Sequence, residues 1–309
     1  KNSLRKVLIR KQQPEPSMVR SGALQEKRKE RSLAQYIFKT EKVTDRITRI
    51  YAVSSERMYL VEGNEKAALL DTGSGIGSIR PVIEQLTKKP LTVLLTHGHV
   101  DHAMGASEFP SDTVYINQED ASIYKEHCTY EFRKHGICLI EKDGRVKGEV
   151  TEADFTPIVP VERYHDLKEG ADFDLGGISI EAFACPGHTR GSLVFLMPEE
   201  RMILLGDACN SFTFMFEDYS TSIEMYKKSL ILLREKLKEK YDTVLASHGD
   251  GKSSPEIIDD NIRLCEKIMG GTSDRVPMEF RGYHGLIADK EAAPGRGNIV
   301  FNPEHIFGK

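Results

Sequence analysis

The segment THGHVDHAMG, residues 96–105, limits what this chain can fold into more than any other stretch. It places three histidines and an aspartate within six residues, directly after the apolar run LTVLL (91–95), which predicts a buried strand. Imidazole nitrogens and carboxylate oxygens are the ligands that zinc and other borderline divalent metals prefer. Without a metal, four such groups at a strand end would compete for hydration and add nothing to a core. The segment therefore predicts a metal site.

The spacing of these donors allows more than one metal position. Residues two apart in an extended segment point to the same side, so His97 and His99 can bind one ion together. If the chain turns into a helix after Gly98, Asp101 and His102 reach a neighbouring position. One short loop could then contribute ligands to two adjacent metals.

Further donors occur in the second half of the chain, each just after an apolar run that predicts a strand. They are His188 in CPGHTRGS (185–192), Asp207 in LLGDA (204–208) and His248 in LASHGDG (245–251). Each of them alone could be an ordinary surface group. Seven donors at four strand ends favour one shared centre.

Five motifs in this chain resemble those of the metallo-β-lactamase-fold hydrolases, and they occur in the order that this family has. They are DTG (71–73), THGHVDH (96–102), PGHT (186–189), GDA (206–208) and SHG (247–249). The resemblance covers roughly residues 45–250. It implies an α/β (α+β) fold, a four-layer αββα sandwich, with a two-metal site at one edge where the loops converge.

The resemblance also implies a role for each donor. His97, His99 and His188 would hold the first metal, and Asp101, His102 and His248 the second. Asp207 would bridge the two, which suits a carboxylate because it has two oxygens. Asp71 would orient a ligand histidine or fix its loop, although it could equally be a plain turn residue.

Two divalent cations, with zinc as the first candidate and iron or manganese as alternatives, would act as the cofactors. Such a pair lowers the pKa of a shared water and polarises the oxygen of the bond to be cleaved, so no serine or cysteine nucleophile is needed. Asp101 and Asp207 are the residues expected to take part in catalysis, and Asp101 could orient the hydroxide or accept its proton.

Among the branches of this family, PGHTRGS and GDA are similar to the motifs of glyoxalase II and of quorum-signal lactonases. We therefore expect a metallo-hydrolase that acts on a small ester, thioester or lactone. Family β-lactamases with the same first motif usually lack the bridging aspartate, and PGHTRGS is not the third motif of the tRNA-processing nucleases. A phosphodiesterase and a mononuclear-iron, persulfide-dioxygenase-like oxidoreductase remain alternatives, while a non-catalytic scaffold is disfavoured because all seven donors are present.

Other residues are candidates for a second layer around the metals or for substrate contact. Tyr164 precedes the third motif, and RGYHG (281–285) near the end of the chain offers Arg281, Tyr283 and His284. The aromatic run SFTFMF (211–216) could line an apolar pocket or form a core strand.

The sequence predicts a basic N-terminal arm over 1–40, a catalytic domain over 41–271 and a C-terminal tail over 272–309 that packs near the site with one strand-like run, NIVF. The hydrophobic and capping patterns within the catalytic domain predict further elements. We expect a hairpin of 57–63 and 67–73, helices at 78–89, 117–136, 222–241 and 254–271, and strands at 91–95, 178–184, 192–197, 202–206 and 242–247.

Charge and cysteine content restrict the partners. Residues 1–31 carry a net charge of +7 and the whole chain −4, so the remainder carries about −11 and a broad nucleic-acid groove is not expected. A small-molecule substrate is the expected partner, and the arm could wrap another subunit of a homo-oligomer. No apolar run of membrane-spanning length occurs, and residues 1–16 lack the apolar core of a signal peptide. Five cysteines without CxxC spacing favour reduced thiols and a cytoplasmic location.

Overall fold

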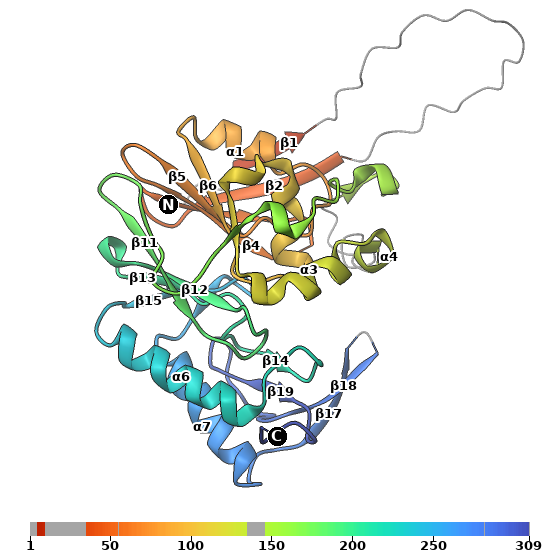
Figure 1. Cartoon of the computed structure of the whole chain (residues 1–309), viewed down its shortest axis with the longest axis vertical. Helices are drawn as coiled ribbons and strands as arrows, with labels where there is room; N and C mark the ends of the chain where they lie inside the picture. Colours follow the sequence, from red (N-terminus) through yellow and green to blue (C-terminus); the bar gives the residue numbers. More distant parts are fainter. Residues whose placement is uncertain (1–4, 10–34, 55, 135–145, 281, 309) are drawn as a thin grey trace, which may run out of the picture.

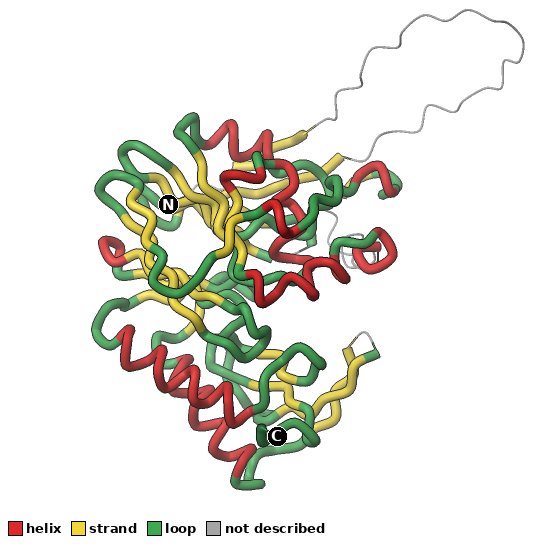
Figure 2. The backbone as a smooth tube through the Cα atoms, in the orientation of Figure 1, coloured by secondary structure: helices red, strands yellow, loops and turns green. Residues whose placement is uncertain are grey.

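The computed structural model describes residues 5–9, 35–54, 56–134, 146–280 and 282–308. Two sheets pack face to face and helices cover their outer faces, as Figures 1 and 2 show. This is the four-layer αββα arrangement expected from the sequence. The helices are α1 (Arg80–Leu86), α2 (Val100–Ala103), α3 (Ala121–His127), α4 (Tyr130–Arg133), α6 (Ile223–Leu237) and α7 (Ile257–Met269).

The first sheet has the strand order β1-β2-β3-β4-β5-β6-β7-β9, with β8 paired to β2. Pairing is antiparallel from β1 to β5 and parallel from β5 to β9. The strands are β1 (Arg5–Ile9), β2 (Gln35–Lys42), β3 (Ile47–Tyr51), β4 (Arg57–Glu62), β5 (Ala67–Leu70), β6 (Leu91–Leu94), β7 (Val114–Ile116), β8 (Val146–Lys147) and β9 (His165–Asp166).

The second sheet has the order β10-β11-β12-β13-β15-β16, in which only the β13–β15 pair is parallel. A third, smaller sheet has the order β14-β19-β18-β17. The strands are β10 (Asp172–Asp174), β11 (Ser179–Ala184), β12 (Leu193–Met197), β13 (Met202–Leu204), β14 (Thr213–Met215), β15 (Thr243–Leu245), β16 (Lys252–Ser253), β17 (Val276–Phe280), β18 (Tyr283–Ile287) and β19 (Ile299–Phe301).

Strand β12 shows why the layers stack as they do. Its residues LVFLM are all buried, so both faces of the strand are covered. Leu193 and Phe195 point into the core between the two sheets, whereas Val194 and Leu196 pack against the helices on the other side. Successive side chains of β12 point to opposite faces of the sheet. One face packs against the first sheet and the other against the helices.

Helix α6 packs on the second sheet through one apolar side. Ser222 caps the helix by accepting a hydrogen bond from the backbone NH of Met225 at 3.3 Å. The buried side chains along the helix include the apolar series expected from its spacing: Ile223, Tyr226, Leu230, Leu233 and Leu237. The β4–β5 hairpin, the strand near 91–95 and the helices near 78–89, 222–241 and 254–271 are likewise confirmed.

Two sequence-based expectations are wrong. The single helix over 117–136 is divided, because Thr129 adopts an extended backbone and its side chain caps α4 by accepting from the NH of Phe132. The tail over 272–309 holds three strands rather than one, since β17 and β18 form a hairpin that pairs with β19. Strands β1 and β2 lie within the expected arm and join the first sheet, while the proposed domain boundaries stay a prediction.

Within the described residues, every helix is too short or too polar to traverse a lipid bilayer. Cys128, Cys185, Cys209 and Cys265 are free and buried thiols. Cys138 lies outside the described residues.

Replacing Phe195 by Ala should lower the free energy of unfolding by about 3–5 kcal/mol, because it removes a fully buried ring from the core between the sheets. Urea titration followed by circular dichroism measures the change. Leu232→Ala, at a side chain on α6 that is 60% exposed, is the control and should change stability by less than about 0.5 kcal/mol. Equal losses for the two variants would contradict the assignment of this core.

Candidate metal centre

The seven candidate ligands meet because the strands that precede them end at the same edge. Parallel strands end side by side, so β5 and β6 bring the loops after Leu70 and Leu94 together. The parallel pair β13 and β15 does the same for the loops that carry Asp207 and His248. A hydrogen bond of 2.8 Å from the NH of Leu193 to the carbonyl of Thr96 then joins the edges of the two sheets.

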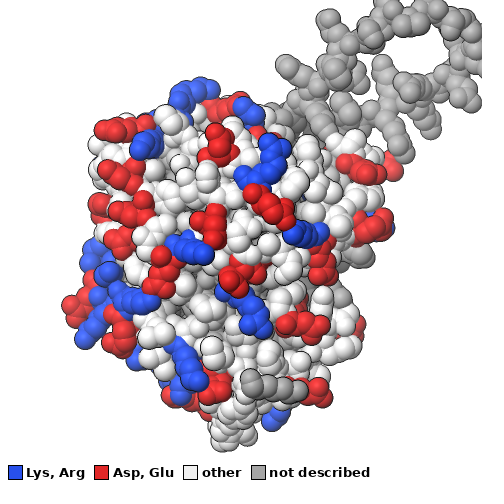
Figure 3. Space-filling model, viewed as in Figure 1, with Lys and Arg blue, Asp and Glu red and all other residues white. Residues whose placement is uncertain are grey.

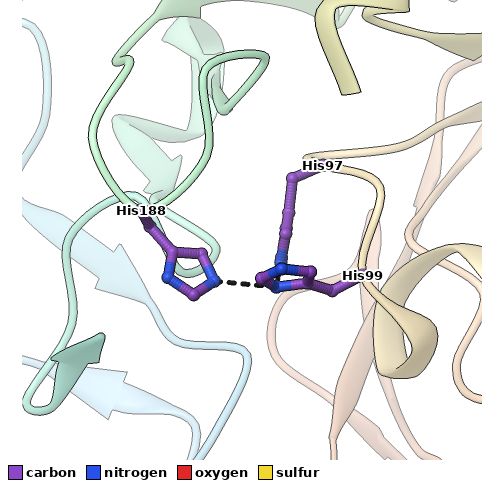
Figure 4. Close-up of side chains that lie close together, drawn as sticks. All are labelled: His97, His99 and His188. Carbon is purple, nitrogen blue, oxygen red and sulfur yellow. Dashed lines mark hydrogen bonds between the residues drawn. The ribbon is translucent and has the colours of Figure 1, made fainter. Parts of the chain in front are cut away.

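A first group consists of His97, His99 and His188, all buried (Figure 4). His99 Nδ1 lies 3.0 Å from His97 Nε2 and 2.9 Å from His188 Nε2. Figure 4 shows the three rings converging from two loops, one after β6 and one before β12. One ring nitrogen of each residue thus faces the same point.

A second group consists of Asp101, His102 and His248. His102 Nε2 and His248 Nε2 lie 3.3 Å apart, and Asp101 Oδ2 lies 3.8 and 3.6 Å from them. Asp207 Oδ2 lies 3.2 Å from His248 Nε2, 3.6 Å from His102 Nε2 and 3.9 Å from His188 Nε2. This carboxylate therefore stands between the two groups, in the position that a bridge requires.

The outward nitrogen of each of three rings has its own hydrogen-bond partner. His102 Nδ1 lies 2.8 Å from Asp71 Oδ2, His97 Nδ1 lies 3.0 Å from Thr96 Oγ1, and His188 Nδ1 donates to the carbonyl of Phe214 at 2.7 Å. Thr96 donates its hydroxyl to Asp71, so its oxygen is free to accept from His97. Protons on these outer nitrogens leave lone pairs on the inner ones.

His99 has a different neighbour. Its Nε2 faces Glu217 Oε2 at 3.8 Å, while its Nδ1 points to His97 and His188. Nitrogen lone pairs that meet at about 3 Å inside a protein repel each other unless a proton or a cation lies between them. The residues of both groups therefore fit divalent metal ions.

The electrostatics of the first group agree with this. Burial, and after it the neighbouring imidazoles, lower the pKa of His97 and His99 well below the usual value, so both rings are neutral and can bind a metal. Burial alone would raise the pKa of Asp207, but His248 and His102 hold it well below its usual value. The pKa of His102 is raised because nearby carboxylates outweigh the effect of burial. The carboxylates of Asp71, Asp101 and Asp207 thus lie close to the ring nitrogens of His102.

Asp71 performs both tasks that the sequence left open for it. Its carboxylate contacts His102 and accepts from the backbone NH of Thr96 at 2.8 Å. Its backbone also turns through the left-handed region, with φ of 60°. A residue other than glycine keeps this conformation only where its surroundings enforce it, and such residues concentrate at functional sites.

Asp120, at the end of a 3-10 turn before α3, is a buried residue that no sequence pattern pointed to. Its Oδ2 accepts from the NH of Gly98 at 2.9 Å and from the hydroxyl of Thr189 at 2.7 Å, and its Oδ1 accepts from the NH of Gly191 at 2.8 Å. A Cβ on Gly191 would lie 2.7 Å from that carboxylate, so glycine is required there. One side chain therefore fastens the loop of His97 and His99 to the loop of His188.

The weaker candidates lie in several places. The hydroxyl of Tyr164 lies 3.3 Å from that of Tyr124, in the core beneath α3. Tyr283 faces Phe216 at a ring separation of 6.1 Å, and His284 is exposed on the same strand. Arg281 lies outside the described residues. The run 211–216 forms β14 at its centre, with Met215 and Phe216 buried.

The chain matches the family model described as the metallo-beta-lactamase superfamily over residues 53–248. An uncharacterized protein of Mycobacterium tuberculosis is 33% identical over 134 residues, which are 42% of this chain and 54% of that protein. Hydroxyacylglutathione hydrolase GloC of Haemophilus influenzae is 26% identical over 200 residues, covering 62% of this chain and 84% of that one. Atrochrysone carboxyl ACP thioesterase of Aspergillus chevalieri is 25% identical over 178 residues, covering 54% and 46%.

The solved structure of the metallo-beta-lactamase DIM-1 superposes with a TM-score of 0.52 at 16% identity, covering 74% of this chain and 97% of that one. This likeness shows a shared fold. The chain spans about half the length of the mycobacterial protein it matches.

Replacing Asp120 by Ala should weaken metal binding by about 10–100-fold, because both histidine loops lose the carboxylate that fixes them. Competition with a chromophoric chelator measures the affinity, and circular dichroism checks the fold. Glu119→Ala, at the exposed neighbouring residue, is the matched control and should bind metal like the parent protein. If Asp120→Ala keeps the parent affinity, the two loops are held in place by other contacts.

Proposed function

The chain belongs to the metallo-beta-lactamase superfamily, and from that premise we propose that it is a metal-dependent hydrolase of a small ester, thioester or lactone. The observation that carries the proposal is the convergence of four loops on two groups of donors with Asp207 between them. The relatives described as a hydroxyacylglutathione hydrolase and as an ACP thioesterase support acyl chemistry over phosphodiester chemistry.

In this proposal each group holds one divalent cation, with zinc as the first candidate. His97, His99 and His188 would hold one ion, and Asp101, His102 and His248 the other, with Asp207 shared between them. Metal ions bound there would supply a water of lowered pKa and would polarise the acyl oxygen of the substrate.

Residues around the candidate ligands fix the orientation and the charge of the centre. Asp71, Thr96 and the carbonyl of Phe214 hold the imidazoles in one orientation and one tautomer, which keeps the inner nitrogens free to bind. Asp207 is only 15% exposed and supplies negative charge where water is scarce. The fixed donors need not reorganise during a reaction, which is a main source of electrostatic catalysis.

Asp101 is the carboxylate placed to move a proton. Its side chain is 35% exposed and that of His248 is 39% exposed, whereas the side chains of His102 and His188 are almost wholly buried. The second group therefore forms the side of the centre that water and substrate can reach. In our proposal Asp101 Oδ2 accepts the proton of the attacking water and returns it to the leaving group.

A small molecule is the proposed substrate. On the face drawn in Figure 3, the Lys and Arg side chains of the described residues alternate with Asp and Glu and form no continuous basic stripe. This distribution supports a small ligand over a nucleic acid.

The function is tested by measuring the metals bound to the purified protein and then its activity on a thioester, a lactone and a bis-aryl phosphodiester. We expect close to two metal equivalents and turnover of the acyl substrates. A single iron with oxygen uptake on a persulfide would instead identify a dioxygenase. Turnover of the phosphodiester alone would identify a phosphodiesterase.

Replacing Asp207 by Asn should lower kcat/KM by about 100-fold or more and reduce the bound metal, because the amide cannot supply the anionic oxygen shared by both groups. Removing the metals with a chelator should abolish activity, and adding zinc should restore it. Asp242→Asn is the control, since this exposed carboxylate pairs with Arg201 at the ends of β15 and β13 opposite to those that lead to His248 and Asp207. An Asp207→Asn variant with full activity and full metal content would refute the bridging role.

A further inference from the structure

Aromatic rings lie against His99, one of the candidate metal ligands. The ring of Tyr219 lies 5.0 Å from that of His99, and His127 stacks on His99 at 5.0 Å. Phe132 stacks in turn on His127 at 3.8 Å. These rings come from α3, from α4 and from the loop after β14, so His127 and Tyr219 contact His99 directly and Phe132 backs His127.

A second group of rings belongs to the third sheet, which meets the centre where His188 donates to the carbonyl of Phe214. Phe214 packs 5.2 Å from Phe280, and Phe216 packs 6.1 Å from Tyr283. Phe280 and Tyr283 face each other across the β17–β18 hairpin, which Figure 1 shows beside β14 and β19. We call Phe132, Phe214, Tyr219, Phe280 and Tyr283 the aromatic surface.

All five rings of the aromatic surface are half-buried. Half-buried rings that adjoin a buried polar centre are typical of ligand sites, where apolar side chains supply contact area and a few polar groups fix orientation. Rings confined to a core, by contrast, would be fully covered, as Tyr59 and Phe195 are.

Carboxylates lie around the same surface. Glu217 Oε2 is 3.8 Å from His99 Nε2, and Asp218 and Tyr219 follow it in the chain. Burial, and then the charges of Glu217, Glu126 and Asp218, raise the pKa of Tyr283. Glu126 belongs to α3, whereas Glu217 and Asp218 follow β14, so these acids come from two different segments. Their negative charge disfavours an anionic group on this surface, whereas the proposed cations would attract one at the centre itself.

We propose that the substrate presents an aromatic or otherwise flat apolar group without negative charge to the aromatic surface, with Tyr219 and Glu217 as specificity-determining residues. The proposal rests on the hydrolase function proposed above and narrows its substrate class to neutral aryl-bearing thioesters or esters. It separates this chain from a glutathione thioesterase, because glutathione carries two carboxylates that would meet Glu217 and its acidic neighbours.

Four thioesters test the proposal: phenylacetyl and acetyl groups, each on the neutral thiol N-acetylcysteamine and on glutathione. We expect kcat/KM to be about tenfold or more higher for phenylacetyl than for acetyl on the neutral thiol, because the ring gains contact with the aromatic surface. On one acyl group, we expect the neutral thiol to exceed glutathione by about fivefold at low salt, with a smaller ratio at high salt.

Two variants test which residues cause the preference for the phenylacetyl group and the preference for the neutral thiol. Tyr219→Leu should lower the phenylacetyl-to-acetyl ratio by about three- to tenfold, because Leu keeps the bulk but loses the ring. Glu217→Gln should lower the neutral-to-glutathione ratio by about threefold and leave the acyl preference unchanged. Ratios between substrates do not depend on how much metal a variant holds. Leu232→Ser, on the exposed side of α6, is the control and should leave both ratios as they are.

A binding measurement separates this inference from the proposed function. Calorimetry should detect binding of the amide in which NH replaces the thioester sulfur of the neutral phenylacetyl substrate, and Tyr219→Leu should weaken that binding at least about threefold. Binding of the amide without turnover of any thioester, ester or lactone would refute the hydrolase function and retain the aromatic surface. Turnover of all four thioesters at equal rates, or preference for the glutathione pair, would overturn the inference and retain the function.

Discussion

Seven polar side chains can lie together at the junction of two sheets only if their lone pairs and charges are balanced. An unpaired buried polar group costs about 1–3 kcal/mol, and a buried charge without a partner costs more. Here the outer side of the cluster is balanced by Asp71, Thr96 and the carbonyl of Phe214, while the inner nitrogens face one another at about 3 Å. The inner nitrogens have no such partner and can bind cations. Metal binding and the ordering of these loops are therefore thermodynamically coupled.

The sandwich gives this cluster a rigid frame. Strand ends fix the direction from which each loop starts, and the hydrogen bond from Leu193 to Thr96 locks the edge of one sheet to the other. Asp120 then joins the two histidine loops, and the glycine at 191 lets it come close enough to do so. The positions of the candidate ligands thus depend on contacts that involve no ligand side chain. The hydrophobic cores keep the strands that carry these contacts in place.

Much of this arrangement could be predicted from the sequence because it follows from local patterns. Donors placed just after apolar runs lie at strand ends, and parallel strands bring such ends together, which is why all seven candidates meet.

Asp120 and Glu217 could not be predicted, since each is a single acid whose partners lie far away in the chain. The third sheet was missed for a related reason: VPMEF contains a proline and a glutamate and becomes a strand only by pairing with distant residues. The division of 117–136 depended on one threonine cap that competes with helix continuation.

Strand β14 connects metal-ligand orientation to the surface that we propose for substrate selection. The carbonyl of Phe214 accepts from His188, while the ring of the same residue packs against Phe280. The backbone of β14 is held by its parallel pairing with β19, where Phe214 lies opposite Val300. A change of side chain at Phe280 therefore alters the surface without moving the carbonyl, whereas a change that loosens β19 disturbs both. Side chains at Phe280 and Tyr283 can thus vary while His188 stays in place, because they belong to β17 and β18 and His188 is held by a main-chain carbonyl of β14.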